Sequence, residues 1–178
     1  MSAAPRSPGS FESTSPESTR RLGACLARSL PDGAVVALIG ELGAGKTALV
    51  QGAADGLGAR ARCDDGDEGA TSPTFVLVRE YEGSGRRIVH VDAHRMRSAA
   101  ELRDIGSDDF LGRGAIAFVE WADRVEAALP RPYLAIHLRH AGETLRRVTW
   151  EGVGPGGEAL ARIAARACAE AGRGMGTP

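Results

Sequence analysis

The chain has 178 residues with 22 basic and 23 acidic side chains, so its formal charge is −1 at neutral pH. This length fits one domain whose core needs no metal or disulfide, and the balanced charge argues against a protein that binds nucleic acid by bulk electrostatics. The longest apolar run, residues 34–39, is too short to cross a membrane, and the first 20 residues lack an apolar signal core, so we expect a cytoplasmic protein. The three cysteines form no CxxC pair, and we expect them to be free thiols.

Hydrophobic periodicity and turn residues divide the chain into helices and strands. Residues 1–15 are rich in Ser and Pro and have little apolar content, so we expect a disordered tail. A helix begins at Ser15-Pro16-Glu17 and ends before Pro31. The expected helices are residues 16–30, 46–57, 98–105, 121–129 and 158–171, and the expected strands are residues 34–39, 75–81, 87–92, 115–119, 133–138 and 144–150.

The order of these elements predicts an α/β fold. Strands and helices alternate early, which favours a mostly parallel central sheet, and later hairpin strands close it into a mixed sheet. Residues 16–151 are expected to form a single domain, and residues 152–178 a C-terminal helical extension with a frayed end.

Residues 40–47 read Gly-Glu-Leu-Gly-Ala-Gly-Lys-Thr and match the phosphate-loop pattern G-x-x-x-x-G-K-[ST] between an expected strand and an expected helix. Glycines let backbone N–H groups face phosphate oxygens, and the helix adds its positive N-terminal end. Lys46, the only lysine of the chain, is expected to reach the β- and γ-phosphates, and Thr47 to ligate Mg²⁺. The predicted nucleotide-binding residues of this P-loop are Glu41, Leu42, Gly43, Ala44, Gly45, Lys46 and Thr47.

Two carboxylates end strands that neighbour this loop in an open parallel sheet. Asp92 follows Ile88-Val-His-Val91, and Glu120 follows Ala115-Ile-Ala-Phe-Val119. Either acid is a candidate to hold Mg²⁺ or to orient an attacking water, and spacing alone leaves the choice open. The simpler alternative for each is a strand-terminal acid that caps the next helix.

Two further segments have functional and structural interpretations. Thr71-Ser-Pro-Thr74 stands where phosphate-loop enzymes keep a switch that orders around the γ-phosphate, although turn chemistry explains it equally well. His90 and His94 flank Asp92 in a pattern that resembles a metal site, but the chain is expected to turn after Asp92, which separates the three side chains. The acidic loop 64–68 lacks the ligand spacing of a calcium site.

Together these motifs resemble the TsaE family, also called YjeE, the small bacterial ATPase required for threonylcarbamoyladenosine on tRNA. The resemblance covers about residues 17–150 and depends on an ordered series of motifs. They are Glu17-Ser-Thr19, Gly40–Thr47, Thr71-Ser-Pro-Thr-Phe75, Tyr81-Glu82, His90-Val-Asp-Ala-His-Arg95 and Glu120-Trp121.

The resemblance implies a P-loop ATPase domain with weak, Mg²⁺-dependent ATPase activity that a partner stimulates. It also implies that the protein acts on a TsaB–TsaD complex, downstream of TsaC, in the formation of threonylcarbamoyladenosine at position 37 of tRNAs. The protein is expected to contact tRNA only through that complex. Carried over by residue, Thr47 and Glu120 hold Mg²⁺ and Asp92 is the essential acid, so Asp92 and Glu120 are the catalytic candidates. The same resemblance implies that Thr19 and Trp121 lie near the nucleotide, and Thr74 of the switch segment is also expected to contact it. The family usually has Tyr where this chain has His94.

Two other functions fit a phosphate loop in a chain of this size. A small-molecule kinase needs an acceptor pocket and usually an arginine-rich lid, and the pairs Arg86-Arg87 and Arg146-Arg147 lie on expected strands. A GTPase usually reads guanine with Asn-Lys-x-Asp. That motif is excluded, because Lys46 is the only lysine.

Overall fold

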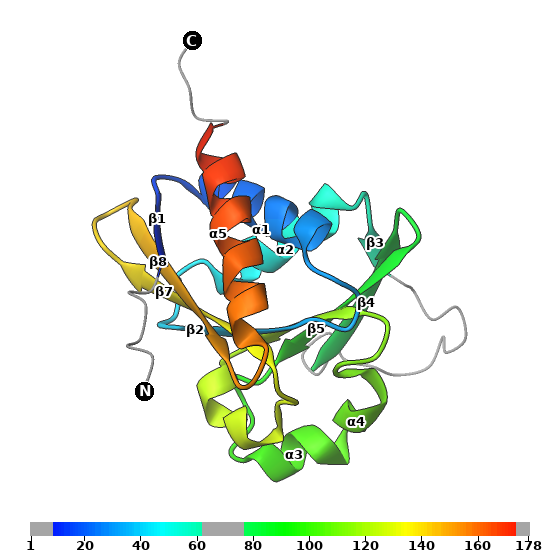
Figure 1. Ribbon diagram of the computed structural model, residues 1–178. Coiled ribbons are helices and arrows are strands. Elements are labelled where there is room, and N and C mark those ends of the chain that lie inside the picture. Colours follow the sequence, from blue (N-terminus) through cyan, green and yellow to red (C-terminus); the bar gives the residue numbers. More distant parts are fainter. Residues whose placement is uncertain (1–8, 62–76, 174–178) are drawn as a thin grey trace, which may run out of the picture.

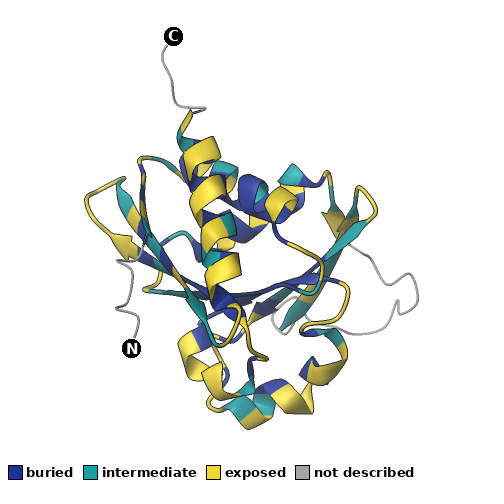
Figure 2. Cartoon of the chain, in the orientation of Figure 1, coloured by how far each residue is buried: buried dark blue, intermediate teal, exposed yellow. Residues whose placement is uncertain are grey.

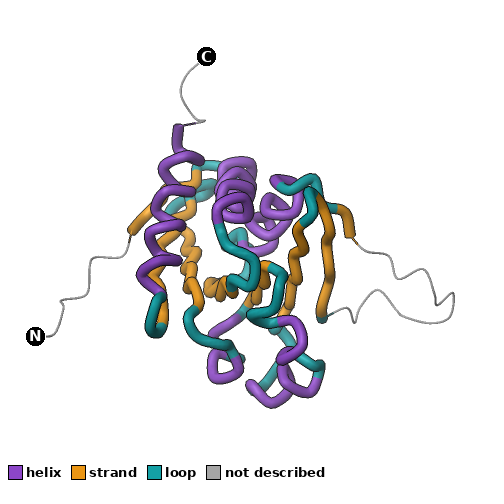
Figure 3. The backbone as a smooth tube through the Cα atoms, turned by 45° about the vertical axis from the view of Figure 1, so that its right-hand side comes forward, coloured by secondary structure: helices purple, strands orange, loops and turns teal. Residues whose placement is uncertain are grey.

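The computed structural model describes residues 9–61 and 77–173, and these form one mixed eight-stranded sheet with helices on both faces (Figure 1, Figure 3). The strands, in the spatial order β1-β8-β7-β2-β6-β5-β4-β3, are β1 (Gly9–Ser13), β8 (Arg146–Val153), β7 (Tyr133–His140), β2 (Val35–Gly40), β6 (Ile116–Glu120), β5 (Arg86–Asp92), β4 (Val78–Gly83) and β3 (Arg60–Ala61). The helices are α1 (Pro16–Ser29), α2 (Lys46–Gly56), α3 (Ala99–Asp104), α4 (Ser107–Phe110), α5 (Gly157–Arg173) and the 3-10 segments η1 (Ala122–Arg124) and η2 (Glu126–Ala128).

The predicted α/β class and mixed sheet are confirmed, but the expectation of a mostly parallel sheet is wrong. Among the described strands, β7, β2, β6 and β5 run parallel in three pairings, whereas β1–β8, β8–β7, β5–β4 and β4–β3 pair antiparallel. Short turns join β4 to β5 and β7 to β8, and a short turn reverses the chain direction. Only the strands joined by longer crossovers are parallel, and these form the centre of the sheet.

Two other expectations for local structure are corrected. Residues 9–13, expected within a disordered tail, form β1 and pair with β8, where Phe11 is buried. The expected helix over residues 121–129 is instead the two short 3-10 segments η1 and η2. Trp121 lies outside the helix with a left-handed backbone conformation (φ 58°), and Val125, between the two segments, has a non-helical conformation (φ −127°, ψ 13°) that interrupts any continuous α-helix.

The core has two layers, one on each face of the sheet (Figure 2). Val36 and Leu38 of β2 pack on the side of α1, α2 and α5, while Val35 and Ala37 pack on the side of α3, α4 and the 3-10 segments. Burial of both faces explains the continuous apolar run from which the strand was predicted. None of the helices in the described ranges is long and apolar enough to cross a membrane.

The C-terminal helix α5, expected as an extension of the domain, packs into the same core as α1. Trp150 of β8 donates its indole N–H to the carbonyl oxygen of Ala161 (3.2 Å). Cys25 of α1 and Cys168 of α5 are buried free thiols, and burial raises the pKa of Cys168 to about 12. Free thiols are thus confirmed at these two positions, and Cys63 lies outside the described residues.

Helices α1 and α2 touch through their backbones at two glycines. A Cβ on Gly23 of α1 would lie 1.9 Å from the carbonyl oxygen of Leu49, and a Cβ on Gly52 of α2 would lie 2.0 Å from that of Arg20. Neither position therefore admits a side chain without moving a helix. This close contact holds α2, and with it the loop that leads into α2, against the rest of the domain.

Replacing Gly23 by alanine is expected to lower the free energy of unfolding by about 1–3 kcal/mol, because overpacking forces the helices apart. In an open helix the same change is stabilising by about 0.5–1 kcal/mol, because glycine loses more backbone entropy on folding. Gly172 of α5, whose Cβ would meet no described heavy atom within 4 Å, is the matched control. Urea unfolding measures both free energies. A Gly23→Ala protein as stable as the wild type would mean that the helices do not approach so closely.

Candidate functional site

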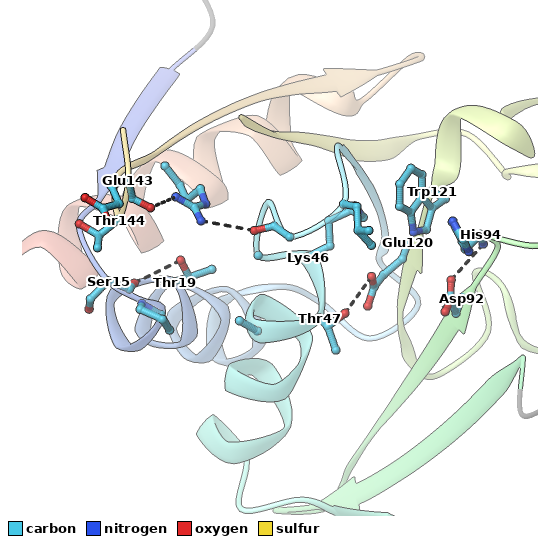
Figure 4. A pocket seen from close by; sticks show the side chains of 16 residues that line it. Ser15, Thr19, Lys46, Thr47, Asp92, His94, Glu120, Trp121, Glu143 and Thr144 are labelled. Atoms are coloured by element: carbon cyan, nitrogen blue, oxygen red, sulfur yellow. Dashed lines mark hydrogen bonds between the residues drawn. The ribbon is translucent and has the colours of Figure 1, made fainter. Parts of the chain in front are cut away.

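Three parallel strands end side by side at one edge of the sheet. Strand β2 ends at Gly40, β5 at Asp92 and β6 at Glu120, and Asp92 and Glu120 are direct neighbours in the β5–β6 register. The carboxyl ends of strands are where open α/β sheets bind ligands. A cavity of about 550 Å³ opens at this edge, between the start of α1, the start of α2 and the turn that joins β7 to β8 (Figure 4).

Most residues predicted for the site line this cavity. They are Thr19, Leu42, Gly43, Gly45, Lys46, Thr47, Asp92, Glu120 and Trp121. The side chains of two others do not line it: Glu41 borders a second cavity between the loop and β7, and Ala44 is fully buried in the core. Thr74 lies outside the described residues, as do the predicted switch segment 71–74 and the acidic loop 64–68.

The loop between β2 and α2 presents the start of α2 to the cavity. Gly45 precedes the helix with φ +104°, a conformation that side chains disfavour, and no side chain caps the helix. The first helical hydrogen bond runs from the N–H of Leu49 to the carbonyl oxygen of Gly45. The four preceding N–H groups therefore lack a partner within the helix, and residues 45–48 all line the cavity. An anion is stabilised at such an end.

Lys46 is folded back against the loop. Its Nζ donates to the carbonyl oxygens of Gly40 (2.7 Å) and Glu41 (2.8 Å) and lies 3.8 Å from the ring centroid of Trp121. Burial lowers the pKa of Lys46, while Glu120, Asp123 and Asp92 act in the opposite direction. The side chain thus places a buried positive charge beside the start of α2.

Glu120 is held from two sides. The Thr47 hydroxyl donates to its Oε2 (3.0 Å), and His90 Nε2 lies 2.8 Å from its Oε1. The Glu120 side chain is 5% exposed. The Glu120 carboxylate and the Thr47 hydroxyl meet beside the N-terminal end of α2, and both are oxygen ligands of the kind that Mg²⁺ accepts.

Asp92 is exposed and lines the cavity beside Glu120. Its Oδ1 accepts a hydrogen bond from the backbone N–H of His94 (2.9 Å), so Asp92 stabilises the turn after β5 as well as facing the cavity. The ring of His94 lies 4.7 Å from that of Trp121, whereas His90 contacts Glu120. The two histidines flanking Asp92 therefore have different partners, and no group of three possible metal ligands occurs among the described residues.

The far wall of the cavity was missed by sequence reasoning, except for Thr19. It contains Ser15 at the start of α1 and Glu143 and Thr144 of the β7–β8 turn (Figure 4). Arg146, the first residue of β8, lines the cavity beside them. Arg146 Nη2 lies 3.5 Å from the carbonyl oxygen of Gly43, and Arg146 Nη1 donates to three carbonyl oxygens of the β7–β8 turn. These turn residues lie about 100 positions from the loop in sequence, and only the folded sheet brings them to it.

A family model described as "Threonylcarbamoyl adenosine biosynthesis protein TsaE" matches residues 13–148. The chain belongs to the TsaE family. The resemblance read from the motifs is therefore confirmed, and the match covers every described residue predicted for the site.

Relatives of this TsaE-family chain extend along most of its length. Proteins named "tRNA threonylcarbamoyladenosine biosynthesis protein TsaE" are 33% identical in Bacillus subtilis (81% of this chain, 85% of that protein) and 36% identical in Treponema pallidum (77% and 96%). The protein of the same name from Streptomyces coelicolor is 39% identical (76% and 90%). The crystal structure of Bacillus subtilis YdiB is similar with a TM-score of 0.71 and 29% identity, over 92% of this chain and 98% of that one.

Proposed function

We propose that this protein binds ATP with Mg²⁺ in the cavity at the start of α2 and hydrolyses it slowly to support tRNA threonylcarbamoyladenosine biosynthesis in the cytoplasm. The relatives are named for that biosynthesis. The observation that carries the proposal is the convergence of Lys46, Thr47 and Glu120 at the N-terminal end of α2, with Thr47 and Glu120 joined by a 3.0 Å hydrogen bond.

The residues that line the cavity fit both ATP and Mg²⁺. The N–H groups of residues 45–48 and the Lys46 ammonium suit the phosphates of a P-loop nucleotide, and Gly45 leaves that approach free of a side chain. Thr47 and Glu120 would hold Mg²⁺, which neutralises phosphate charge when bound. Thr19 and the β7–β8 turn border the other end of the cavity, where they would lie near the rest of the nucleotide.

The catalytic role falls to Asp92 among the residues that line the cavity. Its carboxylate would accept a hydrogen bond from the attacking water and hold that water for reaction, while Glu120 is occupied by Thr47 and His90. Asp92 is exposed, so bulk water surrounds it and weakens its electrostatic effect. A slow intrinsic rate follows, and a partner that covers this edge of the sheet would raise it.

The partner we propose is the TsaB–TsaD complex, which receives its substrate from TsaC, with tRNA bound by the complex rather than by this chain. The even balance of charge supports indirect contact with tRNA. A kinase finds no support: Arg86 is engaged with Asp32 and with carbonyl oxygens of residues 27 and 30, and Arg146 is the only arginine that lines the cavity in the described ranges.

Reconstitution with purified TsaB, TsaD, TsaC, tRNA and ATP tests this function. With the protein present, each TsaB–TsaD complex is expected to modify several tRNAs, because ATP hydrolysis lets the complex turn over. Product is counted by chromatography of digested tRNA. The matched control replaces this chain by its Lys46→Ala variant. Equal product in the presence and absence of the protein would refute the assignment. Turnover of the TsaB–TsaD complex that GTP supports as efficiently as ATP would refute it as well.

A further inference from the structure

His90 lies on β5, next to the strand β6 that carries Glu120. On strands β5 and β6, Asp92 pairs with Glu120 and His90 pairs with Phe118, so the His90 ring reaches diagonally to the carboxylate two positions along the neighbouring strand. The contact is short, with 2.8 Å between Nε2 and Oε1, and both side chains are nearly buried, at 11% and 5% exposed.

His90 does not line the cavity, although Asp92, His94 and Glu120 do. Its ring therefore acts on the cavity only through Glu120. An ionised carboxylate only accepts hydrogen bonds, so Nε2 is the donor in this contact. That bond occupies Oε1 and leaves Oε2 toward Thr47, whose hydroxyl lies 3.0 Å away.

We propose that His90 is a positioning residue for the magnesium site: by donating to Oε1 it fixes the Glu120 carboxylate so that Oε2 and the Thr47 hydroxyl are presented together to the cation. This inference rests on the function proposed above. Histidines and carboxylates that hold metal ligands in this way commonly govern metal affinity by 10–100-fold. His90 thereby controls how strongly Mg²⁺ tightens nucleotide binding, without touching the nucleotide.

The test compares the affinity for a fluorescent ATP analogue in Mg²⁺ with that in EDTA. His90→Phe is expected to lose about tenfold or more of the gain that Mg²⁺ gives the wild type, with the affinity in EDTA changed by less than about twofold. His90→Gln, whose amide N–H replaces Nε2–H, is expected to retain most of the gain. His137→Phe is the matched control, because it removes another histidine–glutamate contact of the sheet (Nε2 to Glu151 Oε1, 3.6 Å) and neither of these two residues lines the proposed nucleotide cavity.

Four outcomes would overturn the proposal. In the first, His90→Phe keeps the full gain in affinity from Mg²⁺, and in the second, His90→Gln is as impaired as His90→Phe. In the third, His90→Phe loses affinity equally in EDTA and in Mg²⁺, which marks a purely structural role. In the fourth, the wild type itself shows no gain from Mg²⁺, which refutes the proposed metal site and this inference with it. That failure is seen in the wild type alone, so it is distinguishable from the other three. If His90→Phe does not fold, His90→Asn, whose shorter amide does not reach Oε1, takes its place in the same comparison.

Discussion

Replacing Lys46 by alanine is expected to lower the affinity for ATP by more than about a hundredfold, which corresponds to about 2.8 kcal/mol or more of binding free energy. The ammonium lies among the loop carbonyl oxygens of Gly40 and Glu41, beside the N-terminal end of α2. No other described residue places a side-chain ammonium at the cavity, because the chain has a single lysine. Titration with a fluorescent ATP analogue measures the loss.

Lys46→Arg is expected to restore little of this affinity. A planar guanidinium carries the same charge, but it does not fit between two carbonyl oxygens and the Trp121 ring as a compact ammonium does. Arg28→Ala, which removes one positive charge from an exposed position on α1, is the control for net charge and is expected to leave affinity unchanged. ATP affinity in Lys46→Ala equal to that of the wild type would refute the phosphate-loop assignment.

How far the sequence predicts this site depends on how local each feature is. The loop at residues 40–47 is a contiguous motif between a buried strand and a helix, so the strand, the helix and the position of Lys46 can all be predicted from the sequence. Asp92 and Glu120 were placed because strand ends in a parallel sheet share one edge. Their different partners, His94 N–H for one and His90 with Thr47 for the other, depend on side-chain packing that no spacing encodes.

The features that were missed are those in which tertiary contacts override local preference. Residues 121–129 contain good helix formers, yet Trp121 adopts φ 58° and sets its ring over the Lys46 ammonium. Such a conformation costs on the order of 1–3 kcal/mol and persists only where surrounding contacts hold it. Strand β1 is likewise defined by its pairing with β8, because residues 9–13 have almost no apolar pattern of their own.

The two carboxylates are expected to fail in different ways when removed. Glu120→Ala is expected to abolish most of the Mg²⁺-dependent gain in ATP affinity and hydrolysis with it, because the buried carboxylate is bonded to Thr47 at the proposed cation site. Asp92→Ala is expected to change ATP affinity by less than about twofold yet slow hydrolysis by about 10²–10⁴-fold, because a group that works through water acts on the rate.

Measurement of both properties on the same variants separates these roles: ATP affinity with and without Mg²⁺, and single-turnover hydrolysis in the presence of the partner complex. The control is Asp104→Ala, which removes an exposed acid from α3 that does not line the cavity and is expected to alter neither property by more than about twofold. A direct ligand of the cation must appear in binding, whereas a water-positioning group must appear in the rate. If Glu120→Ala and Asp92→Ala both hydrolyse ATP at the wild-type rate, hydrolysis does not take place at the carboxyl ends of β5 and β6, and the assignment of both acids is wrong.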